Sequence, residues 1–193
     1  MVRGALIDAV RRRVGVAVAL GAALLALGAC GGGGSSHPSY ATLITEGTTL
    51  LAHGNSAEAS KKFQQAIARK PNGPVAYYDL GVVYQRQRKL FQARREYGLA
   101  IHYDPAYVPA LYNQAGLFAN INPPLAIFYY RRIIRIKPNS PTAYLNLGLV
   151  EAGGPGLRKQ ALRDLTRAVK LDPSLRAQVP APLRSVLPQP SKG

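Results

Sequence analysis

Apolar residues recur at intervals of three and four along most of the chain from Tyr40 to Pro173. This spacing places them on one side of an α-helix, because side chains three and four positions apart share a helical face. Short segments with proline, glycine and asparagine interrupt the pattern. A proline ring cannot continue the hydrogen-bond ladder of a helix, so these segments mark helix ends. The pattern therefore predicts a series of short amphipathic helices joined by turns.

The helical pattern returns with a regular period. Four prolines, each preceded by a charged residue, stand 34, 33 and 35 residues apart: Pro71, Pro105, Pro138 and Pro173. An alanine lies twelve residues before each proline, at Ala59, Ala93, Ala126 and Ala161. A large apolar residue follows each alanine by four positions, at Phe63, Tyr97, Tyr130 and Leu165. The period predicts four copies of one helical hairpin.

The first half of each copy carries a second set of matching positions. The clearest copy has Tyr77, Leu80, Gly81 and Tyr84, and related residues recur in the other copies. Together with the alanines and prolines, these positions resemble the tetratricopeptide repeat (TPR), a helix-turn-helix unit. The resemblance implies an all-α fold, a right-handed superhelical solenoid of about four TPR hairpins. The repeat region is expected at 39–173, with units at about 40–73, 74–107, 108–140 and 141–175.

The hairpins are expected to stack, since a single hairpin cannot bury its own apolar face. Gly81 is predicted to lie at a close crossing of two helices, where a small side chain lets the backbones approach. Ser140 and Pro141 are predicted to form a helix N-cap and a first-turn proline. The first helix contains several threonines, which are mediocre helix formers, so we expect it to fray.

The segment after Pro173 is predicted to cap the last hairpin, because terminal repeats need a polar outer face. We expect 174–193 to form this cap and a disordered tail. The apolar residues that could build a short capping helix are Leu175, Leu183, Val186 and Leu187. Two further prolines, Pro180 and Pro182, would interrupt that helix.

The N-terminal residues have the pattern of an export signal. Basic residues precede an uncharged apolar run from Val14 to Leu27, which is shorter than the ~20 residues of a transmembrane helix. The run ends in Leu27-Gly28-Ala29-Cys30, which contains the only cysteine and resembles the lipobox of bacterial lipoproteins. The resemblance implies that 1–29 is a cleaved signal peptide and that Cys30 is lipidated. An ordinary secretory signal with an incidental cysteine, or a short uncleaved anchor, are the alternatives.

The lipobox resemblance also predicts where the protein is found. Residues 30–38 would form the lipidated cysteine and a flexible Gly/Ser tether. The folded part would then face the periplasm or the exterior, anchored to a bacterial membrane. Gly31, rather than an aspartate, follows the cysteine, so we expect the outer membrane where a cell has two.

The chain is strongly basic, with 25 Lys+Arg against 9 Asp+Glu and a formal net charge of +16. Much of this charge falls on the second helices of the hairpins, so the outer, convex side is expected to be basic. The residues of this basic face are Arg94, Arg95, Arg131, Arg132, Arg135, Arg163 and Arg167. Anionic lipid or acidic polysaccharide could bind there, whereas an exported protein does not normally meet nucleic acid. A solvated face without a ligand is the alternative.

Residues suited to catalysis are few. The single cysteine is assigned to the lipid, and His37, His53 and His102 have no carboxylate or cysteine at metal-ligand spacing. We therefore expect a protein that is not an enzyme, with no cofactor and no metal.

In TPR proteins the first helices line the inner curve and usually hold the ligand, so the resemblance implies a partner groove there. Helical geometry assigns nine residues to it: Ile44, Tyr78, Val82, Gln85, Tyr112, Asn113, Leu145, Asn146 and Leu149. The set is apolar, aromatic and amide-bearing, and an amide can pair with the backbone of an extended peptide. The cations that hold a C-terminal carboxylate in other TPR proteins are missing. The alternative is that these residues pack against a neighbouring helix or the C-terminal segment.

The expected function is a membrane-anchored scaffold that binds a peptide or helix of a protein partner in this groove. Such a scaffold would assist the assembly of a cell-envelope, pilus or secretion complex. The alternative is an electrostatic binder of anionic lipid or polysaccharide through the convex face. The partner and the oligomeric state do not follow from the sequence.

Overall fold

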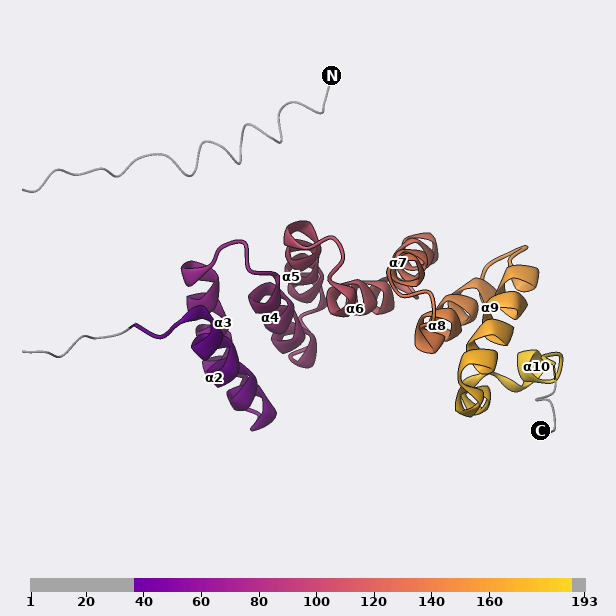
Figure 1. Cartoon of the computed structure of the whole chain (residues 1–193), viewed down its shortest axis with the longest axis horizontal. Coiled ribbons are helices and arrows are strands. Elements are labelled where there is room, and N and C mark those ends of the chain that lie inside the picture. Colours follow the sequence, from indigo (N-terminus) through magenta and orange to yellow (C-terminus); the bar gives the residue numbers. More distant parts are fainter. Residues whose placement is uncertain (1–36, 189–193) are drawn as a thin grey trace, which may run out of the picture. The chain divides into compact units, whose positions relative to one another are not determined.

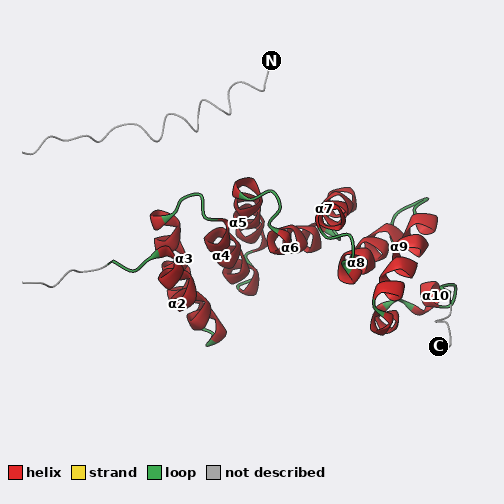
Figure 2. Ribbon diagram, in the orientation of Figure 1, coloured by secondary structure: helices red, strands yellow, loops and turns green. Residues whose placement is uncertain are grey.

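A computed structural model describes residues 37–188, which form helices and no strand (Figure 1 and Figure 2). The elements are α2 (Tyr40–Ala52), α3 (Ser56–Arg69), α4 (Pro74–Arg86), α5 (Leu90–Tyr103), α6 (Val108–Phe118), α7 (Pro123–Ile136), α8 (Pro141–Ala152), α9 (Arg158–Leu171), the 3-10 helix η1 (Pro173–Gln178) and α10 (Ala181–Arg184). None of these helices is long and apolar enough to cross a bilayer. The predicted signal peptide, lipobox and most of the tether lie outside the described residues.

The long helices pack as four hairpins that follow one another along the chain (Figure 1). Within each hairpin the two helices lie against each other: α2 with α3, α4 with α5, α6 with α7, and α8 with α9. The second helix of each hairpin then packs against the first helix of the next. The predicted all-α fold of about four stacked hairpins is confirmed.

Small residues in the first helices allow each hairpin to close. A Cβ added to Gly81 would lie 2.6 Å from Cε1 of Tyr97, and one added to Gly148 would lie 2.7 Å from Cγ of Leu165. Tyr97 and Leu165 belong to the row of large residues found in every copy, and both are fully buried. The glycine therefore provides the space into which the large residue of the second helix packs.

The ends of the helices follow the prolines. The second helices end at Arg69, Tyr103, Ile136 and Leu171, two residues before the four repeat prolines. Pro141 starts α8 as predicted, but Ser140 does not cap that helix through its side chain. Its hydroxyl lies 2.6 Å from the Tyr112 hydroxyl of the previous hairpin and hydrogen-bonds to it instead.

The predicted fraying of the first helix is wrong, because α2 is continuous from Tyr40 to Ala52. The Ser39 hydroxyl accepts a hydrogen bond from the backbone N–H of Thr42 at 3.1 Å, which caps the helix. Further threonine hydroxyls donate to backbone carbonyls one turn earlier. Leu43 and Leu51 are buried against the rest of the array, and such packing outweighs a weak helix propensity.

The C-terminal segment covers the apolar end of the last hairpin. Leu175, Leu183 and Leu187 are buried there, whereas Val186 is 55% exposed and does not contribute as predicted. The Arg176 guanidinium donates to the carbonyl oxygens of Pro188 at 2.8 Å and Arg184 at 3.1 Å. These bonds satisfy backbone acceptors in a segment too short to pair them within one helix.

Candidate functional site

The predicted groove residues lie on α2, α4, α6 and α8, the first helices of the four hairpins. We call the surface that they form, with Asp79 and Gly116, the first-helix face. Eight of the nine predicted residues keep part of their surface exposed; Leu145 does not. Tyr78 and Tyr112 occupy equivalent positions in successive repeats, and the structure leaves both partly exposed.

Leu145 is 2% exposed, so the prediction that it contacts a partner is wrong. It packs in a cluster with Leu165 and with Leu175, Val179 and Leu183 of the C-terminal segment. Leu149 is partly buried against the same cluster. The C-terminal segment therefore covers the last hairpin at Leu145, while Leu149 keeps part of its surface exposed.

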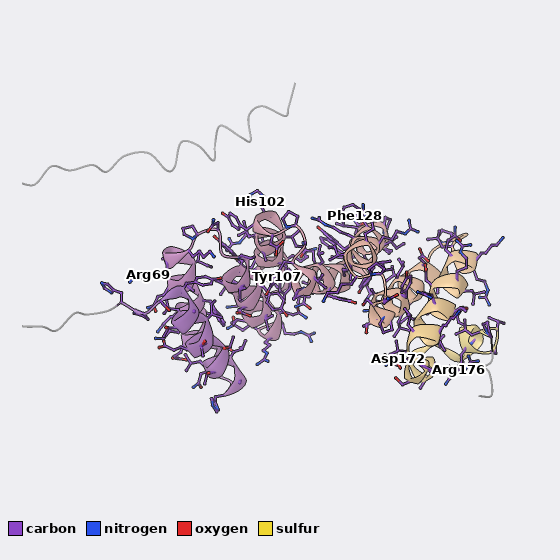
Figure 3. The ribbon with its side chains drawn as sticks, in the orientation of Figure 1. Arg69, His102, Tyr107, Phe128, Asp172 and Arg176 are labelled. Atoms are coloured by element: carbon purple, nitrogen blue, oxygen red, sulfur yellow. The ribbon has the colours of Figure 1, made fainter. Side chains whose placement is uncertain are left out.

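Tyr78 forms part of an aromatic cluster between the second and third hairpins. Its ring lies 5.8 Å from the ring of Tyr97 and 5.6 Å, edge to face, from that of Tyr107. Tyr107, labelled in Figure 3, directly precedes α6. Burial raises the pKa of the Tyr78 hydroxyl, and the charge of Asp79 raises it further. The ring is thus held in place while one side of it stays accessible.

A chain of hydrogen bonds joins the amides of the first-helix face across two hairpins. The Tyr97 hydroxyl donates to Oε1 of Gln85 at 2.7 Å, and Nδ2 of Asn113 donates to the Tyr97 hydroxyl at 3.0 Å. Tyr97 is fully buried, and burial raises the pKa of its hydroxyl. Gln85 and Asn113 therefore stabilise the junction between α4, α5 and α6, in addition to any role toward a ligand.

Sequence reasoning missed Asp79, which lies beside Tyr78 on α4. Burial raises the pKa of its carboxyl to about 7. Oδ2 of Asp79 is shielded from solvent and has no hydrogen-bond partner. The signal was present, because Asp79 occupies the repeat position of Asn113 and Asn146, both assigned to the groove.

A hollow of about 460 Å³ opens between α8 and the turn that joins α6 to α7. Asn146 and Leu149 line it from α8, opposite Ala119 and Tyr130. These are two of the predicted groove residues, so the third and fourth hairpins offer a concave surface beside them. Among the described residues, no group of three or more His, Cys, Asp or Glu side chains is placed to hold a metal ion.

Comparison with known proteins agrees with this architecture. Residues 47–87 match the family model described as TPR repeat. MamA shares 25% identity over 72% of this chain and 81% of its own, with a TM-score of 0.63. The fold is that of the tetratricopeptide repeat.

Two further TPR structures resemble the chain. YrrB, described as a TPR protein with an unusual peptide-binding site, is 20% identical over 70% of each chain, with a TM-score of 0.63. The first TPR of Spaghetti (RPAP3), bound to the HSP90 peptide SRMEEVD, is 22% identical over 65% of this chain and 94% of its own, with a TM-score of 0.55. No curated protein matches the sequence.

The TPR array uses several arginines of the predicted basic face for its own contacts. Arg95 pairs with Glu96 at 2.6 Å, and Arg131 pairs with the fully buried Glu151 of the next hairpin at 2.8 Å. Arg94 lies over the ring of Phe118, 5.4 Å from its centroid.

Two more arginines, Arg132 and Arg167, reach back to the loop before their own hairpin. Arg132 donates to the Pro105 carbonyl at 2.5 Å, and Arg167 donates to Oδ1 of Asn139 at 3.3 Å. Both stand six residues after a repeat alanine. Of the predicted basic face, Arg135 and Arg163 are the exposed members without such a contact among the described residues.

The second helices also border a hollow of about 580 Å³ between α7, α8 and α9. Its wall is mainly apolar and includes Ile127 and Phe128, which is 49% exposed (labelled in Figure 3). Asp164 lines it, and burial, together with a hydrogen bond to Glu151, raises the pKa of Asp164 to about 6. The fully buried Glu151 and the partly buried Asp164 thus bring two carboxyls together at the junction of the last two hairpins.

Proposed function

We propose that this TPR array is a non-enzymatic scaffold whose first-helix face binds a peptide or helix of a protein partner. One observation carries the proposal: aromatic, apolar and amide side chains stay partly exposed at equivalent positions of successive repeats. Tyr78 and Tyr112 form one such row, and Val82 and Leu149 lie in another. A strip of spaced apolar anchors edged by amides suits an extended or helical peptide.

The resemblance to TPR structures with peptide sites supports the proposal. YrrB is described by its peptide-binding site, and the first TPR of Spaghetti is bound to a peptide. Sequence identity is low in both cases, so the likeness supports a mode of binding rather than a particular partner.

Gly116 provides a test of the groove that leaves the fold intact. It is exposed in α6 at the repeat position of Val82 and Leu149, and a Cβ added to it would meet no atom within 4 Å. Because the position is exposed and its Cβ has open space, Gly116→Trp should place a bulky ring in the middle of the strip. Gly116→Ala is the matched control, because it makes the same backbone change without the bulk.

The binding experiment uses a random peptide library displayed on phage and the purified protein as bait. We expect selected peptides to lose binding to Gly116→Trp and to keep it with Gly116→Ala. Aromatic side chains often dominate such interfaces, so truncating Tyr112 should also cost about 2 kcal/mol or more of binding free energy if it is a hot spot. Peptides that bind the wild type and Gly116→Trp equally would show that the first-helix face is not the site.

The convex-face alternative is electrostatic and separates from the groove by its salt dependence. Binding of anionic lipid vesicles through Arg135 and Arg163 should disappear as the ionic strength rises, because exposed charges are screened. Peptide capture by an apolar strip should largely persist. The intramolecular contacts of Arg95 and Arg131 favour a structural role for much of the basic face.

We also propose that the scaffold is lipid-anchored through Cys30 and assists the assembly of an envelope, pilus or secretion complex. This part rests on the Leu27-Gly28-Ala29-Cys30 motif. Cys30→Ser should release the protein from the membrane fraction of cells, and mass spectrometry should find a lipid-modified N-terminal Cys30 in the wild type only. A Cys30→Ser protein that still sediments with membranes in high salt would contradict the anchor.

A further inference from the structure

We propose that Asp79 and the tyrosines around it form a site for a basic side chain, lysine or arginine, of the bound peptide. This inference rests on the proposed function, because it places one anchor of the peptide on the first-helix face. It assigns to that face a charge preference which the amides and apolar residues alone would not give.

Asp79 differs from the other acids of residues 37–188. The other acids that are buried or partly buried have partners in the structure. Glu46 pairs with Lys62, Glu96 with Arg95, Glu151 with Arg131 and Asp164 with Glu151, while Asp104 and Asp172 accept hydrogen bonds from backbone N–H groups. Oε2 of Glu151 is also buried without a hydrogen-bond partner, but Glu151 is paired through its other oxygen. Among residues 37–188, Asp79 has neither a hydrogen bond nor an ion pair, and its Oδ2 is shielded from solvent. Removing a carboxylate from water without a partner is unfavourable, and a ligand that supplies a cation would remove that cost.

The surroundings of Asp79 are aromatic and come from three hairpins. Tyr78 precedes Asp79 in α4, and its ring lies 5.8 Å from that of Tyr97 on α5 and 5.6 Å from that of Tyr107 before α6. Burial raises the pKa of these tyrosines and of Tyr40 on α2, and the charge of Asp79 adds to the rise in each. The faces of aromatic rings attract ammonium and guanidinium groups. A carboxylate among tyrosine rings is therefore suited to a basic side chain.

The tyrosine hydroxyls are largely occupied elsewhere. The Tyr40 hydroxyl accepts from the backbone N–H of Ala76 at 3.2 Å, and the Tyr97 hydroxyl donates to Gln85. Nζ of Lys70 lies over the Tyr40 ring, 5.5 Å from its centroid. Lys70 forms no ion pair with Asp79. Asp79 as a whole is only partly buried, so a cation from outside the chain can approach its carboxyl.

The position of Asp79 in the repeat would fix the register of the peptide. Asn113 and Asn146 stand at the same place in the next two repeats and are uncharged. A basic residue of the peptide would therefore lie beside the second hairpin, and its uncharged part would run along the third and fourth.

Binding should depend on pH in a direction set by Asp79. Burial keeps its pKa near 7, so part of the population is protonated at neutral pH. A bound cation favours the charged carboxylate and lowers the pKa. Asn113 of α6, which hydrogen-bonds to Tyr97, is neutral, and the tyrosines from α2, α4, α5 and the loop before α6 remain protonated. The affinity for a basic peptide should therefore rise between pH 6 and pH 8.

The test compares peptides selected from the phage library on the wild type and on Asp79→Asn, with Glu58→Gln, an exposed acid on α3, as the control. We expect one position enriched in lysine or arginine on the wild type and on Glu58→Gln, and no such enrichment on Asp79→Asn. A synthetic peptide with the selected sequence should bind Asp79→Asn about tenfold more weakly than it binds the wild type. A variant of this peptide with norleucine in place of its basic residue should bind the wild type about tenfold more weakly as well. When the norleucine peptide is measured on Asp79→Asn, the two losses of affinity should not add, since both substitutions remove the same contact. A purely structural role of Asp79 would not make the affinity for the basic peptide rise between pH 6 and pH 8, so measuring affinity against pH separates it from the cation site.

Two results would overturn the inference and are distinguishable. Selected peptides without a basic position, bound equally by the wild type and Asp79→Asn but lost on Gly116→Trp, would refute the cation site and leave the groove standing. Peptides unaffected by Gly116→Trp would refute the proposed function and the cation site together.

Discussion

Alanine should destabilise the protein when it replaces Gly81 and stabilise it when it replaces Gly116. Both glycines lie in the first helix of a hairpin, so the gain in helix propensity is the same, roughly 0.5–1 kcal/mol. At Gly116 nothing opposes that gain, because the new Cβ would have no neighbour within 4 Å. At Gly81 the Cβ would lie 2.6 Å and 2.7 Å from two ring carbons of Tyr97.

The ring of Tyr97 cannot move aside easily, because it is fully buried and its hydroxyl is bonded to Gln85 and Asn113. Overpacking of this kind costs on the order of 1–3 kcal/mol. After the gain in propensity, Gly81→Ala should lose up to about 2.5 kcal/mol, and Gly81→Leu should lose more. Relative to the wild type, the melting temperature should fall by several degrees for Gly81→Ala and rise by about 1–4 °C for Gly116→Ala.

Thermal and urea unfolding followed by far-ultraviolet circular dichroism measure both variants in one buffer. Equal melting temperatures for the two alanine variants would refute the assignment of Gly81 to the crossing of α4 and α5. A Gly81→Ala protein more stable than the wild type would do the same.

Three further predictions concern the polar groups of the array. Asp79 and Asp164 have pKa values raised to about 7 and about 6, so each binds its proton more tightly in the folded chain than in the unfolded chain. The free energy of unfolding should therefore rise as the pH falls from 8 to 5. Urea titrations at each pH check this, and Asp79→Asn should make the free energy of unfolding less dependent on pH. Asn113→Ala should cost about 1 kcal/mol by removing its bond to Tyr97, seen as faster hydrogen exchange in α5 and α6. Arg131→Ala should lower the free energy of unfolding in urea by roughly 1–3 kcal/mol, because it leaves Glu151 without its cation. Arg135→Ala is the control and should leave this free energy nearly unchanged. An Arg131→Ala protein as stable as the wild type would contradict the importance of that pair.

Much of the fold is predictable from the sequence because a few residue types have only one structural use here. The four prolines end the second helices, and the small residue of each first helix must face the large residue of the second. Gly81 and Tyr97 show this pairing directly. The fraying expected for α2 was wrong because propensity was judged without the Ser39 cap and the packing of Leu43.

The candidate site was predictable only in part. Helical geometry places Leu145 on the ligand side, but the C-terminal segment, whose path the repeat pattern does not define, covers it. Asn113 was expected to bind a peptide. Its amide also donates a hydrogen bond to Tyr97, which is a contact between hairpins that sequence spacing does not reveal. Asp79 was missed since the burial that makes its carboxyl unusual arises from packing between helices, which sequence spacing does not reveal.

The most direct test of the account locates a selected peptide on the protein. The peptide carries a photoreactive group at an apolar position, and mass spectrometry identifies the cross-linked residues. The account predicts cross-links on α4, α6 and α8, at or beside Val82, Gly116 and Leu149. Cross-links confined to α5, α7 and α9, around Phe91 or Phe128, would contradict it.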